Sequence, residues 1–197
     1  MVLTEVRQRL LSMMEEDSRV RAELSANGEL FEGYAPEMAE VHERNARELE
    51  AIIERYGWPG KSLVGEEGAD AAWLILQHAI GRPELLRKCL PHLKGAAKRG
   101  EADPAHAAYL EDRICFFERR PQHYGTQFDW DEEGNLSPWL LEDPEKVDEN
   151  RSSVGLEPLA ERIKEVRKEI EDEQRPGDFK KRQEELLAWA RSVGWLP

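Results

Sequence analysis

The chain has 197 residues, enough for one domain with a substantial hydrophobic core, and 35% of them are charged. Its 28 lysines and arginines against 41 aspartates and glutamates leave a formal net charge of −13. This charge argues against binding to nucleic acid or to anionic membranes, because both are bound chiefly through Lys and Arg, and it favours a cationic or neutral partner.

Hydrophobic periodicity predicts a mainly α-helical protein of about six or seven helices. An apolar stripe at helical spacing runs from Leu3 to Leu24 and stops before Asn27-Gly28. A second helix is predicted from Pro36 to Gly57, with the proline in the first turn. The stretch GEEGADAAWLILQHA, residues 65–79, is apolar around almost its whole circumference and therefore predicts a central helix.

Prolines delimit the next helical region. Between Arg82 and Gly100 we expect one or two shorter helices, because Pro91 lacks an amide hydrogen and should break or kink the element. Asp103 and Pro104 form a suitable cap and first turn for a further helix that ends before Pro121.

The last third of the chain contains both strand and helix patterns. Alternation of apolar and polar residues on both sides of Glu133-Gly134-Asn135 predicts a short β-hairpin insertion near 127–140. Two apolar stripes joined by a turn at Arg175-Pro176-Gly177-Asp178 predict a C-terminal helical hairpin over about 157–193. We expect residues 1–197 to form a single-domain helical bundle, with this hairpin packed on the core or forming a homo-oligomer.

Three groups of polar side chains interrupt the most apolar part of the chain. Charged and hydrogen-bonding groups are costly to bury unless they bond to one another, so the pattern predicts one shared polar centre. The groups are Glu66, Glu67, Asp70, Gln77 and His78; Asp112 and Arg113; and Gln122, His123, Tyr124, Thr126 and Gln127.

Each group also has a structural interpretation. Glu66 and Glu67 suit the first turn of a helix, where negative charge is favourable. Asp70 and Arg113 are expected to pair, and a structural salt bridge accounts for that pair as well as substrate binding does. The loop around Gly125 is either a ligand-binding loop or a turn whose side chains satisfy its own backbone.

The functional interpretation assigns a role to each residue. Proton transfer is expected from Tyr124 together with a histidine, His78 or His123. Substrate binding is assigned to the remaining polar positions, Asp70, Gln77, Asp112, Arg113, Gln122, Gly125, Thr126 and Gln127.

No metal or cofactor is predicted. Glu67, Asp70, His78 and His123 could be drawn together, but neither an H-E-x-x-H motif nor paired cysteines mark a zinc site. The sequence also lacks a phosphate loop, a dinucleotide fingerprint and a G-x-S-x-G elbow.

Cysteine content and apolar runs indicate the compartment. The chain has 2 cysteines, far apart in sequence, so a disulfide framework is not expected. The longest apolar run, Ala71 to Leu76, falls far short of the roughly 20 residues that cross a bilayer, and the first residues do not form a signal peptide. We expect a soluble, cytoplasmic protein.

Four segments resemble an uncharacterised bacterial family of unknown function. They are WPGKSLVGEEGADAAWLILQHA, AYLEDRI, QHYGTQF and LEDPEKVDENRSSVGLEPLAE, between about Tyr56 and Ala160. The family is marked by a D-R element followed by Q-x-Y-G-T-Q, and Arg119-Arg120 stands where its members often carry a glycine. The resemblance implies no reaction, and it places family motif positions at Gln77, His78, Asp112, Arg113, Gln122, Tyr124, Gly125, Thr126 and Gln127.

Two functions fit these observations. The first is an enzyme acting by acid–base chemistry, through hydrolysis or group transfer on a small polar molecule or peptide in a buried polar pocket. The alternative is a non-catalytic binding or protein-interaction module, in which the polar network fixes the fold and the acidic surface meets a basic partner.

Overall fold

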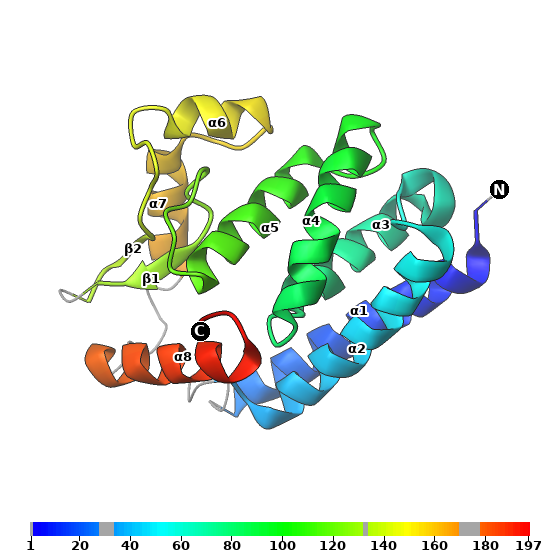
Figure 1. The fold of residues 1–197 in the computed structure, drawn as a ribbon, viewed down its shortest axis with the longest axis horizontal. Coiled ribbons are helices and arrows are strands. Elements are labelled where there is room, and N and C mark those ends of the chain that lie inside the picture. Colours follow the sequence, from blue (N-terminus) through cyan, green and yellow to red (C-terminus); the bar gives the residue numbers. More distant parts are fainter. Residues whose placement is uncertain (1, 28–33, 132–133, 170–177) are drawn as a thin grey trace. The chain divides into compact units, whose positions relative to one another are not determined.

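The computed structural model describes residues 2–27, 34–131, 134–169 and 178–197 (Figure 1). The described part contains eight helices and one antiparallel pair of strands, which confirms the predicted mainly α-helical fold. Contacts divide the chain into two compact units, Met1–His106 and Ala107–Pro197, and each is described by itself. The single-domain organisation stays a prediction.

The first unit is built on three helices that pack against one another, α1 (Thr4–Ala26), α2 (Pro36–Tyr56) and α3 (Lys61–His78). The first two coincide with the predicted apolar stripes. Burial of each large apolar side chain contributes about 1.5–3 kcal/mol, so these stripes stabilise the packing of the helices. The fully or nearly buried members are Leu10, Met13, Leu24, Met38, Val41, Leu49 and Ile53.

Helix α3 begins earlier than predicted and is interrupted at Gly65. This residue has φ 76° and ψ 170°, so the turn at residues 61–64 is separated from the regular helix that follows. Glycine adopts this positive φ without the steric penalty of a Cβ atom. The predicted central helix at residues 65–79 therefore corresponds closely to the regular part of α3.

Helix α4 (Pro83–Lys98) continues through Pro91 as one element. A break at this proline was one of the expected outcomes, and it does not occur. The missing amide hydrogen bond and the ring clash cost about 3 kcal/mol. Burial of Leu86 and Leu93 on the two sides of Pro91 contributes about 1.5–3 kcal/mol for each side chain, which is enough to keep the helix continuous.

The boundary between the units falls within α5 (Pro104–Phe117). The Oδ1 atom of Asp103 accepts a hydrogen bond from the backbone N–H of Ala105 at 2.8 Å, which confirms the predicted cap. The predicted hairpin is also present, with β1 (Phe128–Trp130) antiparallel to β2 (Leu136–Pro138). In its predicted turn, Glu133 lies outside the described residues.

Three helices complete the second unit: α6 (Val147–Ser153), α7 (Leu159–Glu169) and α8 (Phe179–Val193). Helix α6 was not predicted, because its sequence VDENRSS is too short and too polar to show an apolar stripe. Helices α7 and α8 confirm the two predicted C-terminal helices, and α7 packs against α6 and β2. Their predicted turn falls largely on residues 170–177, outside the described part.

Candidate functional site

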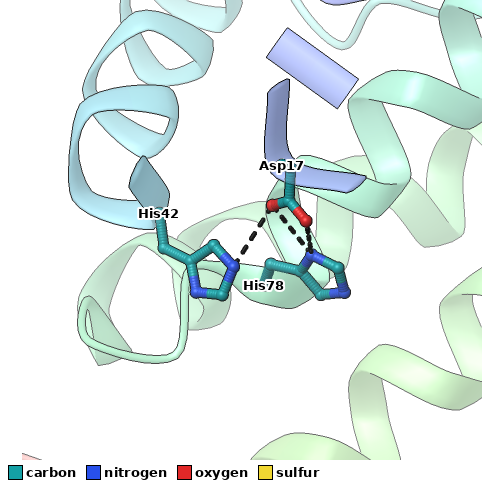
Figure 2. A group of neighbouring side chains, drawn as sticks. All are labelled: Asp17, His42 and His78. Atoms are coloured by element: carbon teal, nitrogen blue, oxygen red, sulfur yellow. Dashed lines mark hydrogen bonds and ion pairs between the residues drawn. The ribbon is translucent and has the colours of Figure 1, made fainter. Parts of the chain in front are cut away.

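Three titratable side chains from three helices meet in the first unit (Figure 2). Asp17 comes from α1, His42 from α2, and His78 is the last residue of α3. Because these helices pack against one another, residues far apart in sequence are brought into direct contact. The cluster joins a carboxylate to two imidazoles, a combination suited to proton transfer or to metal binding.

Apolar packing places two of these polar residues in the interior. Asp17 lies four residues after Met13 and seven before Leu24, and all three are buried on α1. His42 lies four residues after Met38, which is also buried on α2. Residues at this spacing share one helix face, so burial of the stripe carries the polar side chain inward.

The carboxylate of Asp17 lies between the two imidazoles. Both of its oxygens are 3.0 Å from Nδ1 of His78, and Oδ2 is 3.2 Å from Nε2 of His42. The side chains of Asp17 and His42 are 2% and 8% exposed, whereas that of His78 is 18% exposed. His78 is therefore the member of the cluster that solvent or a small molecule reaches most easily.

Tyr34 extends the cluster on the other side of His42. Its hydroxyl lies 2.7 Å from Nδ1 of His42. If the hydroxyl donates to Nδ1, His42 carries its proton on Nε2, the nitrogen that faces the carboxylate of Asp17. His78 then donates from Nδ1 to the same carboxylate, and its Nε2, on the ring edge away from Asp17, is the basic nitrogen (Figure 2).

The electrostatics agree with this arrangement of protons. Burial by itself raises the pKa of Asp17, but the hydrogen bonds and charges of His42 and His78 outweigh it and bring the pKa well below its ordinary value. Asp17 is therefore ionised at neutral pH. Burial, together with the negative charges of Asp17 and Glu43, raises the pKa of Tyr34, so Tyr34 keeps its proton.

The predicted residues of the first unit separate into buried and exposed positions. Asp70 is exposed, whereas Gln77 and His78 at the end of α3 are partly buried. Glu66 and Glu67 are also exposed and form surface ion pairs with Lys61 and Arg7 respectively. Of the predicted proton-transfer residues, His78 is thus the one that lies in the cluster with Asp17 and His42.

In the second unit, Asp112 organises the Q-x-Y-G-T-Q loop. Its carboxylate is fully buried and accepts hydrogen bonds from the backbone N–H groups of His123 at 2.8 Å, Tyr124 at 3.1 Å and Thr126 at 3.0 Å. The hydroxyl of Thr126 donates to the same carboxylate. Asp112 and the loop, predicted to lie together, are therefore in direct contact.

Gln122 and Arg151 support the loop from within the same unit. The side-chain amide of Gln122 donates to the carbonyl of Gln127 and accepts from its N–H, both at 2.9 Å. Arg151 is fully buried and donates to the carbonyl of Tyr124 at 2.8 Å. The Gln122 bonds satisfy backbone groups of the loop, as the structural interpretation expects. The side chains expected to do so, Thr126 and Gln127, bond to other side chains, and Arg151 belongs to α6.

The remaining loop residues have varied surroundings. Gly125 has φ 66°, which confirms the unusual backbone angle expected there. His123 forms an ion-pair contact with Glu142, and Tyr124 is partly buried, which raises its pKa. Two further predictions join residues of both units. They are the Asp70–Arg113 pair and the single polar centre formed by all three polar groups, and both stay predictions.

Sequence reasoning missed Asp17 and His42, although a signal for both is present. Each is a polar residue at an apolar stripe position, Asp17 between Met13 and Leu24 and His42 one turn after Met38. A charged side chain at such a position requires a partner, and that requirement marks it as a site candidate.

The model of DUF6624, a family of unknown function, matches residues 4–172. The chain belongs to this family. The match extends the resemblance seen between Tyr56 and Ala160 to α1 and α2, and it therefore includes Asp17 and His42. No curated protein and no solved structure matches the chain.

One position at which this DUF6624 chain departs from the expected pattern has a defined backbone conformation. Arg119, at the point where the resemblance leads us to expect glycine, has φ 57° and is the one non-glycine residue with positive φ in the described ranges. Glycine occupies this conformation without strain, whereas other residues pay a steric cost. The guanidinium of Arg119 lies 3.8 Å from the ring centroid of Trp139, a stabilising cation–π contact.

Proposed function

We propose that this protein is an enzyme that acts by acid–base chemistry, through hydrolysis or group transfer on a small polar molecule or a peptide. The contact between the buried carboxylate of Asp17 and Nδ1 of His78 carries the proposal. A carboxylate at this position orients an imidazole and stabilises the imidazolium that forms when the ring accepts a proton.

In this proposal His78 is the general base. Its Nε2 accepts a proton from a water molecule or from a substrate hydroxyl and later returns it to the leaving group. Asp17 is a positioning residue that holds the ring through Nδ1, and His42 helps to hold Asp17. A general base in this role contributes about 10²–10⁴-fold to the rate.

The roles predicted for the second unit also remain part of the proposal. Burial, followed by the charges of Glu111 and Asp112, raises the pKa of Tyr124. Tyr124 therefore keeps its proton and can donate a hydrogen bond. His123 is the second candidate for proton transfer. Asp112 acts on either residue by fixing the backbone that carries it.

We further propose a cytoplasmic location and a partner other than nucleic acid. The described residues include no helix that is both long and apolar enough to cross a membrane. The two buried free cysteines support the cytoplasmic location. The net charge of −13 supports a partner other than nucleic acid.

The alternative, a non-catalytic binding or interaction module, is favoured by the contacts in the second unit. The side chains of Asp112, Gln122 and Arg151 bond to backbone groups of the loop, which is what a structural network requires. The two functions differ in the first unit, because only the enzyme requires His78 to exchange protons with a bound molecule.

A kinetic comparison tests the enzyme. Wild type and variants are assayed against chromogenic carboxylic esters, amino-acid anilides and phosphate esters. We expect His78→Gln and Asp17→Asn to lower kcat/KM by at least about 100-fold. The matched control is His92→Gln, an exposed histidine of α4, and it should keep the wild-type rate. Equal rates in all four proteins contradict the proposal.

A spectroscopic measurement tests the same assignment without a substrate. Long-range ¹H–¹⁵N correlation spectra of the imidazoles report which ring nitrogen carries the proton. We expect neutral His78 to carry it on Nδ1, since that nitrogen contacts the ionised Asp17. A proton on Nε2 would remove the basic nitrogen that the mechanism needs.

A further inference from the structure

We infer that Asp17, His42 and His78 form a binding site for one divalent transition-metal ion of the zinc type. The binding itself is argued from ligand geometry, and only the role of the ion in catalysis rests on the proposed function. Among the residues that the structure describes, this is the one group of three His, Cys, Asp or Glu side chains whose ligand atoms all lie within 4.8 Å of one another.

The kinds of ligand select the class of ion. Two imidazole nitrogens and one carboxylate suit Zn²⁺ and the neighbouring divalent ions, which bind nitrogen strongly. Mg²⁺ and Ca²⁺ prefer sites made entirely of oxygen ligands. The side chain of Asp17 supplies the single negative charge in this group.

The distances match those between ligands of one ion. Zinc lies about 2.0–2.2 Å from nitrogen and oxygen ligands, so neighbouring ligand atoms around it are about 3–3.5 Å apart. The observed separations from Asp17 are 3.2 Å to Nε2 of His42 and 3.0 Å to Nδ1 of His78. The ligand atoms of the group all lie within 4.8 Å of one another, and the ring centroids of the two histidines are 5.0 Å apart.

The surroundings of His42 also fit a metal ligand. Metal-binding histidines usually form a hydrogen bond through the second ring nitrogen, which fixes the tautomer. Here Nδ1 of His42 lies 2.7 Å from the hydroxyl of Tyr34. With an ion on Nε2, the proton of His42 moves to Nδ1 and the Tyr34 hydroxyl accepts it, a change that requires only a rotation of the hydroxyl.

Asn45 adds a second polar group on the same helix face. It lies three residues after His42 and is 1% exposed. Its Nδ2 donates to the carbonyl of Met13, whereas its Oδ1 has no hydrogen-bond partner among the described residues. A buried acceptor without a partner is unusual in a native protein, and a buried water molecule is a suitable donor for it.

Among the described residues the group offers three protein ligands, the number that catalytic zinc sites use. Structural zinc sites use four protein ligands, whereas catalytic sites keep a position for water or substrate. His78, the most exposed of the three at 18%, gives access from solvent. In the ion-bound protein His78 is a ligand through Nδ1, and proton transfer passes to the water at the remaining position.

Isothermal titration with Zn²⁺ tests the site directly. The full chain is stripped with EDTA, dialysed and titrated with ZnCl₂, and the absorption of the Co²⁺ form is recorded in parallel. We expect one ion per chain, and binding at least about 100-fold weaker in His42→Gln, His78→Gln and Asp17→Asn. The controls His92→Gln and His106→Gln alter histidines outside the group and should bind like wild type.

Absence of binding to the wild type, or equal binding by the wild type and the three cluster variants, would overturn the inference. If circular dichroism shows that a variant does not fold, wild-type spectra decide instead. Zn²⁺ should then shift the imidazole ¹⁵N signals of His42 and His78 and leave that of His92 unchanged. Unaltered signals at His42 and His78 would also overturn it.

The two proposals fail in different ways. Turnover that persists in EDTA-stripped protein, together with no Zn²⁺ binding, overturns the metal site and leaves the acid–base enzyme. Tight binding at the three residues without turnover of any substrate supports the metal site and counts against the enzyme.

Discussion

Replacement of Asp112 by asparagine tests whether one buried carboxylate holds the Q-x-Y-G-T-Q loop. The substitution keeps the size of the side chain and exchanges one acceptor oxygen for an NH₂ group. Oδ1 accepts from the N–H of His123, Oδ2 accepts from the N–H of Thr126, and the N–H of Tyr124 lies between the two oxygens. In either orientation of the amide, at least one backbone donor therefore faces another donor.

The expected loss of stability follows from these contacts. A hydrogen bond to a charged acceptor contributes about 1.5–3 kcal/mol, and a buried donor left unsatisfied costs about 1–3 kcal/mol. Two weakened backbone contacts thus correspond to about 3–5 kcal/mol. Removal of the charge offsets part of this loss, since burial raises the pKa of Asp112 despite its hydrogen bonds. We expect a net destabilisation of about 3 kcal/mol, which lowers Tm by about 6–12 °C in a chain of this size.

Urea denaturation gives the free energy of unfolding, and amide hydrogen exchange reports on the loop. Exchange should accelerate most at His123, Tyr124 and Thr126, the residues whose N–H groups lose their acceptor. Glu149→Gln is the control, because Glu149 is exposed on α6 and its charge removal should change stability by at most about 0.5 kcal/mol. A loss below about 1 kcal/mol for Asp112→Asn, with unchanged exchange in the loop, would refute this account.

Three further outcomes are expected. Arg119→Gly should be more stable than Arg119→Ala by about 1 kcal/mol in urea denaturation, because both lose the contact with Trp139 but only alanine is strained at φ 57°; equal stability would contradict this. Burial raises the pKa of both Cys89 and Cys115 to about 11, so at pH 8 on the order of one thiol in a thousand is ionised, and iodoacetamide should label them only after denaturation. Burial lowers the pKa of His106, so the unfolded chain binds its proton more readily and stability falls as the pH drops below 6.5; His106→Phe should flatten this dependence in urea denaturation at pH 5 to 8.

The long helices were predictable because their signal is local. The apolar stripes of α1 and α2 repeat every three or four residues over five or more turns, and any compact fold must bury them. The hairpin was predictable for the same reason, because its alternation and its turn lie within a few residues. Helix α6 has only seven residues, and its single buried apolar residue, Val147, leaves no period to detect.

The cluster in the first unit could not be derived from local spacing. Its contacts join α1 to α2 and to the end of α3, and the partner of Asp17 depends on how these helices pack. The sequence shows only that Asp17 interrupts an apolar stripe. In the second unit, Asp112 and its loop are separated by 11 to 14 residues, a shorter connection, and here the association of the two groups was predicted.

The two buried carboxylates serve different purposes because their donors differ. Asp112 accepts from backbone N–H groups, which cannot titrate, so its charge fixes a conformation. Asp17 contacts two imidazoles, a type of side chain that can accept and donate protons and bind metal ions. Well-packed apolar residues at the positions of Asp17 and His42 would often stabilise a helix interface at least as well as a buried polar group does. The burial of these polar groups is consistent with the chemistry that we propose at His78.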